Sequence, residues 1–231
     1  MKRAMHNHFF LSVRFFLLLP VLYMFIDSVR GIFRKTKEMQ LCGKLGSNVT
    51  EDEWRNVYGI DLSTGKKTLI STGTYDVASI AGSTAKSLYF MASPENNAQR
   101  YLYEVDLKGR KKDARLTPAK YAGINTYNIS PNGKYAIHSH RAALAPQQVH
   151  LISLPDHKII KTLIDNQKYA DKISGLKMPS VEFIEVETPE GIRVNGRVLK
   201  PDSFDENKQY PVIFHVYGEP WGQVAQDSWI G

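Results

Sequence analysis

The sequence has a single cysteine, and no G-x-S-x-G motif occurs anywhere in its 231 residues. With Cys42 alone the chain cannot form an intrachain disulfide, so cysteine usage says nothing firm about the compartment. G-x-S-x-G is the sharp strand-to-helix turn on which many hydrolases present a nucleophilic serine. Because the motif is absent, no serine of this sequence can be assigned as a nucleophile.

Beyond its first 44 residues the chain also lacks an excess of charge of either sign. The formal net charge is +7, but eight lysines and arginines stand against two acidic residues within Met1–Lys44. The remaining sequence carries 22 basic and 21 acidic residues. A basic tail beside an apolar run is more typical of a membrane topology signal than of a phosphate-binding surface, so we expect no nucleic-acid partner.

One long apolar run is present, and it covers the 18 residues Phe9–Ile26. As a helix it would measure about 27 Å, close to the hydrocarbon thickness of a bilayer. No small-residue cleavage site follows Ile26, so residues 1–44 are predicted to hold a retained anchor and to place the protein at a membrane or in a periplasmic, extracytoplasmic setting. A buried helix, or an N-terminus of foreign origin that never meets a membrane, is the alternative.

The middle of the chain, Trp54–Lys177, consists of short β-rich runs separated by Gly, Pro, Asn and Asp turns. The sequence VYGIDLSTGKK returns twice, as LYEVDLKGRKK and as VHLISLPDHKI. Two further markers share the interval, and all the steps are 45 to 48 residues long. The positions that define the three markers are Tyr58, Tyr103 and His150, then Tyr75, Tyr121 and Tyr169, then Tyr89 and Tyr135.

A period near 46 residues with about four strands per unit is the signature of a β-propeller blade. Residues 45–178 have room for two to three blades, whereas a closed propeller usually needs at least four. The sequence ISPNGK, Ile129–Lys134, has the Pro and Asn-Gly chemistry of a hairpin turn between two strands. The sequence therefore predicts a mainly β fold with a partial β-propeller.

Two polar features of the repeats could be taken for ligand sites. His138 and His140 lie two residues apart on one strand face, which is the spacing of a metal pair. No third ligand of matching type is close in sequence, so solvated or hydrogen-bonded strand histidines are expected, with no metal. The basic run Lys108–Lys112 lies in a blade turn beside Asp106 and Asp113, and a solvated hairpin is expected there.

After Pro179 the pattern changes. Val181–Thr188 and Ile192–Pro201 flank a Pro-Glu-Gly turn and predict an antiparallel hairpin. The run Tyr210–Gly218 has the continuous hydrophobicity of a strand that is covered on both faces. Two antiparallel strands followed by a buried strand and a Gly-Pro loop are typical of the start of an α/β-hydrolase sheet. Residues 179–231 are therefore predicted to be the beginning of such a domain, truncated after this loop.

The sequences ASPENNAQRYLYEVDL, VETPEGIRVNGRVLKPDSFD and YPVIFHVYGEP resemble the dipeptidyl peptidase IV branch of the prolyl oligopeptidase serine peptidases, over roughly Trp54–Trp229. The resemblance implies a propeller that caps an α/β-hydrolase domain, release of N-terminal X-Pro or X-Ala dipeptides from peptide substrates, no cofactor, and a homodimer in the full-length family. It also implies that Tyr217 donates a hydrogen bond to the oxyanion, on a loop shaped by Gly218, Glu219 and Pro220. Without the resemblance, Tyr217 would be a tyrosine that ends a buried strand with its hydroxyl toward water.

The departures from the family limit what this chain is expected to do. Only 14 residues follow Tyr217, so no Ser-Asp-His triad can be assigned, and the chain is expected to be inactive alone. Glu51 and Glu53 lie in a segment that does not align, and they are not assigned the family's role of holding a substrate amine. Two alternatives stay open, which are a non-catalytic, membrane-tethered propeller-type binding module and an assembly in which a separate chain supplies the triad.

Overall fold

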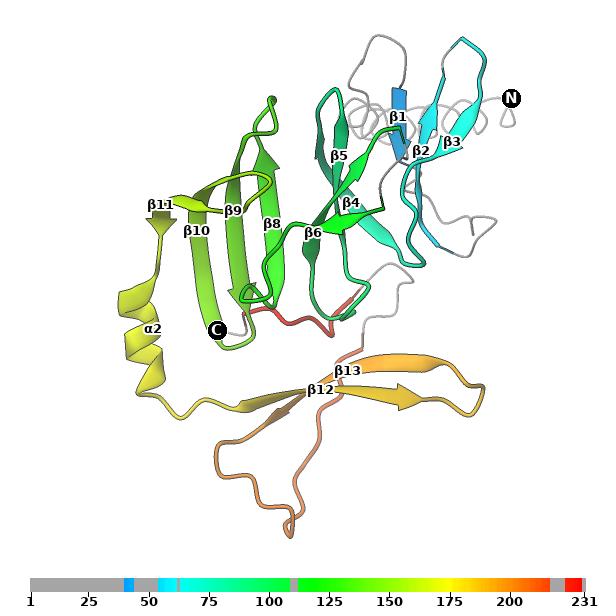
Figure 1. The fold of residues 1–231 in the computed structure, drawn as a ribbon. Helices are drawn as coiled ribbons and strands as arrows, with labels where there is room; N and C mark the ends of the chain where they lie inside the picture. The colour runs from blue at the N-terminus through cyan, green and yellow to red at the C-terminus, as the bar shows by residue number, and fades with distance from the viewer. Residues whose placement is uncertain (1–39, 44–53, 62, 109–111, 217–222, 230–231) are drawn as a thin grey trace, which may run out of the picture.

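The computed structural model describes residues 40–43, 54–61, 63–108, 112–216 and 223–229 (Figure 1). Within them the chain is mainly β and forms four antiparallel sheets and one short helix. The predicted anchor Phe9–Ile26 lies outside these residues, and no helix within them is long and apolar enough to cross a membrane.

The first sheet has three strands in the order β1 (Gln40–Gly43), β2 (Val57–Ile60) and β3 (Lys67–Leu69). The turn between β2 and β3 is organised by Asp61, whose carboxylate accepts a hydrogen bond from the Ser63 amide at 2.8 Å. Gly65 supplies the left-handed conformation that closes this turn, with φ 70°.

The second and third sheets are four-stranded meanders. The second is formed by β4 (Val77–Ser83), β5 (Ser87–Ala92), β6 (Tyr101–Asp106) and β7 (Ala114–Arg115). The third is formed by β8 (Ile124–Ile129), β9 (Tyr135–Ala142), β10 (Ala145–Ser153) and β11 (Ile159–Ile164). In each sheet, consecutive strands are neighbours, as in a propeller blade.

The predicted repeat is realised in these three sheets. Tyr89 and Tyr135 fall in β5 and β9, the second strands of their sheets. Tyr58 falls in β2, Tyr103 in β6 and His150 in β10. Each of these is the last strand but one of its sheet in chain order. The prediction of a mainly β, propeller-like fold with two to three blades is confirmed, and the described sheets do not close into a ring.

The core consists of two layers, one on each face of the second sheet. Phe90 and Tyr103 point toward the first sheet and pack with Val57 and Ile70. On the opposite face, Leu102 packs with residues of the third sheet, including Ala136 and Ile152. Alternation along the strand thus holds, but both faces of β6 are covered because the second sheet is sandwiched between the other two.

The predicted turn at Ile129–Lys134 connects β8 to β9. Asn132 accepts a hydrogen bond from the Lys134 amide at 3.0 Å, and Gly133 has φ 68°. A Cβ atom on Gly133 would lie 2.5 Å from Cγ2 of Thr84, so this glycine is required both for its backbone conformation and for close approach to the second sheet.

A short helix, α2 (Gln167–Ser174), lies in the region for which the sequence predicts only short β-rich runs. Tyr75 and Tyr121 precede the first strands of their sheets and pack inward, whereas Tyr169 lies on α2 with 47% of its surface exposed. Asp165 stabilises the start of the helix by accepting a hydrogen bond from the Gln167 amide at 3.1 Å. The third copy of this marker therefore begins a helix instead of a further sheet.

The C-terminal region contains the predicted hairpin, which is formed by β12 (Ser180–Glu187) and β13 (Arg193–Lys200). The predicted buried strand is not formed over 210–216, where the backbone is irregular and Ile213 is 94% exposed. A strand exists through hydrogen bonds to a neighbour, and no described strand lies alongside this run. The division of the chain into segments 1–44, 45–178 and 179–231 stays a prediction.

Candidate functional site

A C-terminal segment, residues 223–229, runs along the ends of the second and third sheets (Figure 1). Its central residue is Asp227, whose carboxylate accepts hydrogen bonds from Nε2 of Gln99 and from the amide of Ala143, both at 2.8 Å. The Asp227 amide in turn donates to the carbonyl of Ala98 at 2.8 Å. One side chain thereby joins the β5–β6 loop to the β9–β10 turn. We call residues 223–229 the staple.

The staple also contacts the C-terminal hairpin. Arg197 of β13 donates a hydrogen bond to the Gln226 carbonyl at 3.0 Å. Residues from both four-stranded sheets and from the hairpin therefore meet at this edge of the molecule.

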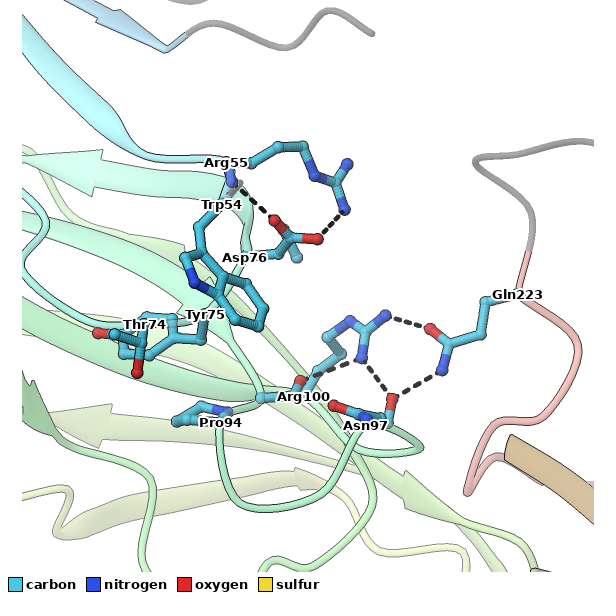
Figure 2. Close-up of a pocket in the computed structure, with 11 residues that line it drawn as sticks. Trp54, Arg55, Thr74, Tyr75, Asp76, Pro94, Asn97, Arg100 and Gln223 are labelled. Atoms are coloured by element: carbon cyan, nitrogen blue, oxygen red, sulfur yellow. Dashed lines mark hydrogen bonds and ion pairs between the residues drawn. The ribbon is translucent and has the colours of Figure 1, made fainter. Parts of the chain in front are cut away.

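A cavity of about 250 Å³ opens beside the first residue of the staple (Figure 2). Its walls come from the segment before β2, the segment before β4, the β5–β6 loop and the staple. The side chains that give it chemical character are Trp54, Arg55, Tyr75, Asp76, Arg100 and Gln223.

Arg55 and Asp76 form an ion pair at the rim of the cavity. The Asp76 carboxylate accepts from the Arg55 amide at 2.7 Å and from its guanidinium at 3.3 Å. Both side chains are nearly half exposed, so the pair contributes little to stability, about 1 kcal/mol or less. The pair matters for the charge of the cavity, because it holds the Asp76 carboxylate against Arg55, one of the two arginines that line it.

Arg100 is the second arginine, and its guanidinium is held by neutral oxygens. Nη1 donates to the Gln99 carbonyl at 2.7 Å and to the Asn97 carbonyl and Ser93 Oγ at 3.0 Å. Nη2 donates to the amide oxygen of Gln223. Burial lowers the pKa of Arg100, and the nearby positive charge of Arg55 acts in the same direction, whereas the Asp76 carboxylate opposes them.

Tyr75 separates the cavity from the core of the second sheet. Its ring packs against Phe90 and Tyr103, and its hydroxyl donates a hydrogen bond to Asp113. Burial and the adjacent carboxylate raise the pKa of Tyr75, so the phenol stays neutral. Trp54, 41% exposed, supplies a second aromatic surface to the cavity.

A second polar cluster lies on the third sheet and is formed by residues of β9, β10 and the β10–β11 turn together with Tyr121. Four histidine rings surround Tyr121, with ring centroids 4.8 to 6.2 Å away; they belong to His138, His140, His150 and His157.

His138 is fully buried, and its Nε2 donates to the Asn125 side-chain oxygen at 2.8 Å. His140 Nε2 donates to the Ala122 carbonyl at 2.7 Å. The two predicted strand histidines are thus hydrogen-bonded inside the protein. Among the described residues, no three His, Cys, Asp or Glu side chains are grouped so that they could hold a metal ion.

The chemistry of the cluster is set by burial. The pKa of His138 is lowered to about 3, chiefly by burial and in smaller part by the neighbouring histidines. His150 and His157 also have lowered pKa values, in both cases chiefly because of burial. These three histidines are therefore neutral at pH 7, and the cluster forms a structural core within the blade.

The residues proposed from the sequence for catalysis are not among those described. Tyr217, Gly218, Glu219 and Pro220 lie outside the described residues, as do Glu51 and Glu53. Tyr217 as an oxyanion donor stays a prediction.

Sequence reasoning missed the cavity and the staple. Arg100 lies within a stretch that carried the family resemblance, NAQRYLY, but nothing in that stretch indicates that its partner is Gln223, 123 residues away.

The sequence is similar to that of known proteins over part of its length. A model of the dipeptidyl peptidase IV (DPP IV) N-terminal region matches residues 36–147. Dipeptidyl peptidase 4 of Arthroderma otae is 29% identical over 179 residues, which are 76% of this chain and 23% of that protein. Dipeptidyl peptidase 4 of Trichophyton rubrum is 28% identical over 178 residues, 76% of this chain and 23% of that protein.

The fold has a similar solved structure. Dipeptidyl peptidase 4 of Porphyromonas gingivalis superposes with a TM-score of 0.72 at 24% identity, over 86% of this chain and 27% of that one. The chain thus spans about a quarter of the length of the relatives it matches. The repeated blades, their two-layer core and these matches agree: over residues 36–147 the chain matches the dipeptidyl peptidase IV N-terminal region, and its fold is similar to that of a dipeptidyl peptidase 4.

Proposed function

We propose that this chain provides propeller blades and the entry into the catalytic domain of a serine-type dipeptidyl peptidase that releases X-Pro or X-Ala dipeptides from peptides. The observation that carries the proposal is the pair of four-stranded sheets built on the 46-residue repeat, in a chain whose curated relatives are named dipeptidyl peptidase 4. The α/β-hydrolase assignment for residues after Pro179 belongs to this proposal, with the hairpin β12–β13 as its first element.

In this proposal Tyr217 donates its phenolic hydrogen to the oxyanion of the tetrahedral intermediate. The loop that carries it is followed directly by Gln223, which Arg100 and the Asn97 carbonyl hold at the cavity, the latter bond being 2.7 Å long. An oxyanion donor is useful only if it is preorganised, and a fixed loop end serves that purpose.

The chain by itself contains no G-x-S-x-G motif, so we expect it to bring no nucleophile to the reaction. Purified chain is therefore expected to leave Gly-Pro and Ala-Pro chromogenic substrates intact, and a fluorophosphonate probe is expected not to label it. Hydrolysis above the rate of a buffer blank, or covalent labelling, would contradict the proposal.

A positive test supplies the missing groups. Co-expression with a polypeptide that carries the Ser-Asp-His part of a dipeptidyl peptidase is expected to generate dipeptidyl peptidase activity, measured as release of X-Pro from a chromogenic substrate. Tyr217→Phe in this assembly is expected to lower kcat by about 100- to 1000-fold with a smaller change in KM. Equal kcat values for the two forms would remove the oxyanion role from Tyr217.

A second candidate function is a membrane-tethered binding module without catalysis. It is favoured by the cavity beside the staple, which the described residues form without any contribution from a nucleophile. The anchor over Phe9–Ile26 and an extracytoplasmic location are proposals under either function. A chain that stays monodisperse in solution favours the binding module, whereas aggregation through open sheet edges favours a part of a larger peptidase.

A further inference from the structure

We propose that the cavity between Trp54, Tyr75 and Arg100 binds a carboxylate ligand, and that the Arg100 guanidinium is the group that receives it. The inference goes beyond the peptidase proposal, because it needs neither Tyr217 nor a triad. The ligand class is a small organic acid or the carboxylate of a peptide, seated against an aromatic wall.

The charged side chains that line the cavity do not balance one another. Two guanidinium groups, those of Arg55 and Arg100, line the cavity with a single carboxylate, that of Asp76. Asp76 is engaged by Arg55 through two hydrogen bonds. Within the described parts of the chain, no ion pair joins Arg100 to a carboxylate, so the cavity has one positive charge in excess.

The positive charge of Arg100 is costly to remove from water. Removing an arginine from water without a carboxylate partner is unfavourable, and neutral carbonyl groups compensate only in part. Arg100 is nevertheless held firmly, because three oxygens of its own loop accept from Nη1. The only carboxylate in the cavity lining, that of Asp76, acts on Arg100 without forming an ion pair with it. A partly buried guanidinium that is firmly positioned and has no ion-pair partner among the described residues is suited to bind an anion from outside.

Arg100 also has a donor, Nε, that no described residue occupies. The four hydrogen bonds of Arg100 to described residues use Nη1 and Nη2, and none of them uses Nε. Nη2 is occupied only by the neutral amide oxygen of Gln223. A carboxylate is a stronger acceptor than an amide, and one that approaches Nε can share Nη2 in the two-pronged geometry that arginine prefers.

The size and the lining of the cavity also favour such a ligand. A volume of about 250 Å³ is smaller than that of a cavity for a drug-sized ligand, and it suits a small acid or one residue of a peptide. Trp54 and Tyr75 add aromatic surface to the cavity that Arg100 also lines (Figure 2). An aromatic or acyl group attached to the carboxylate would pack there while the charge meets Arg100.

The probe that isolates this chemistry is benzoate, with benzamide as its uncharged isostere. Isothermal titration of the whole chain is expected to show millimolar or tighter binding of benzoate, and binding of benzamide weaker by about tenfold or more. Trp54 lines the cavity, so benzoate is also expected to change tryptophan fluorescence, and Trp54→Phe is expected to remove that change. Equal affinities for the two compounds, or no binding of benzoate, would overturn the proposal.

Substitutions test the residue that is responsible. Arg100→Gln is expected to abolish benzoate binding. Because Arg100 also holds its own loop, Arg55→Gln is the second variant; it leaves Arg100 in place and releases the Asp76 carboxylate, and it is expected to weaken benzoate severalfold. Arg193→Gln is the matched control, since Arg193 is an exposed, ion-paired arginine on the hairpin, and it is expected to bind as the parent does. If Arg55→Gln binds benzoate as tightly as the parent does, the charge argument is wrong.

Competition distinguishes the sources of the carboxylate. A short peptide with a free C-terminus, its C-terminally amidated form, and an amidated peptide with an internal glutamate separate a terminal from a side-chain carboxylate. Displacement of benzoate by any one of these free carboxylates supports the proposal. Displacement by sulfate at the same concentration would mean a general anion site and would overturn the carboxylate assignment. This binding test does not depend on peptidase activity, so its failure leaves the proposed function untouched.

Discussion

Acidification is expected to destabilise the third sheet through His138. The ring is fully buried, and its Nδ1 has no hydrogen-bond partner, so protonation would place an uncompensated charge in the core. Burial lowers the pKa of His138 to about 3 in the folded chain, whereas an unfolded histidine titrates near its ordinary value of 6.5. Below pH 6.5 the unfolded state therefore binds the proton more readily, and folding free energy is lost as the pH falls toward 3.

The size of the effect follows from the pKa difference. Each pH unit below 6.5 costs about 1.4 kcal/mol, so at pH 5 His138 alone lowers the free energy of unfolding by about 2 kcal/mol. The lowered pKa values of His150 and His157 act in the same direction, and the positive charge of Lys120 contributes to lowering both. Asp156 opposes this effect at His157.

Urea unfolding at pH 7.5 and pH 5 measures the loss. His138→Gln keeps an amide N–H that can reach Asn125 but does not titrate, so the difference between the two pH values is expected to shrink by about 2 kcal/mol. His215→Gln is the control, because His215 is exposed and distant from the cluster in sequence, and it is expected to keep the parental pH dependence. Identical pH dependence in the parent and in His138→Gln would refute the assignment of a buried neutral His138.

Three further predictions concern the packing and the staple. Phe90→Ala is expected to lower the free energy of unfolding by about 3 to 5 kcal/mol, because the ring is fully buried between two sheets; a shift in urea midpoint with an unchanged slope checks it, and a loss under about 1 kcal/mol contradicts it. Asp227→Asn is expected to lower the free energy of unfolding by about 1 to 3 kcal/mol and to speed hydrogen exchange of the Ala143 amide; unchanged protection of that amide would contradict the role of Asp227. Gly133→Ala is expected to destabilise the chain more than Gly65→Ala, since both glycines have φ near +70° but only the first would meet Thr84; equal losses in thermal unfolding would show that backbone conformation alone decides the cost.

The blades could be predicted from sequence because their repeat is local in origin. Tyr58, Tyr103 and His150 recur at a fixed interval, and each lies in the corresponding strand of its sheet. The repeat does not predict the structure at Tyr169, because a tyrosine that precedes a sheet packs inward only when a further strand follows it. Here the following residues form α2 instead.

The hydrophobic run over 210–216 shows the second limit. Its composition predicts a buried strand, but a strand needs a neighbouring strand, and no described strand pairs with this run. Composition reports what a segment can do in a sheet, and the neighbours decide whether it does so.

The cavity could not be predicted, since its chemistry comes from tertiary placement. Arg100 looks like any other basic residue at the start of a strand, and Gln223 looks like an ordinary polar residue in a loop. Their contact, and the absence of an ion pair between Arg100 and the described carboxylates, follow only from the way the staple returns to the β5–β6 loop.

Strand β5 has a consequence for how the chain melts. Leu88 and Phe90 on this one strand belong to the core shared with the first sheet, and Tyr89 and Met91 belong to the core shared with the third. Because a single backbone carries both layers, neither layer can be lost while the other stays intact. A calorimetric scan should accordingly record one heat-absorption peak for the three sheets, with no separate transition for an individual blade.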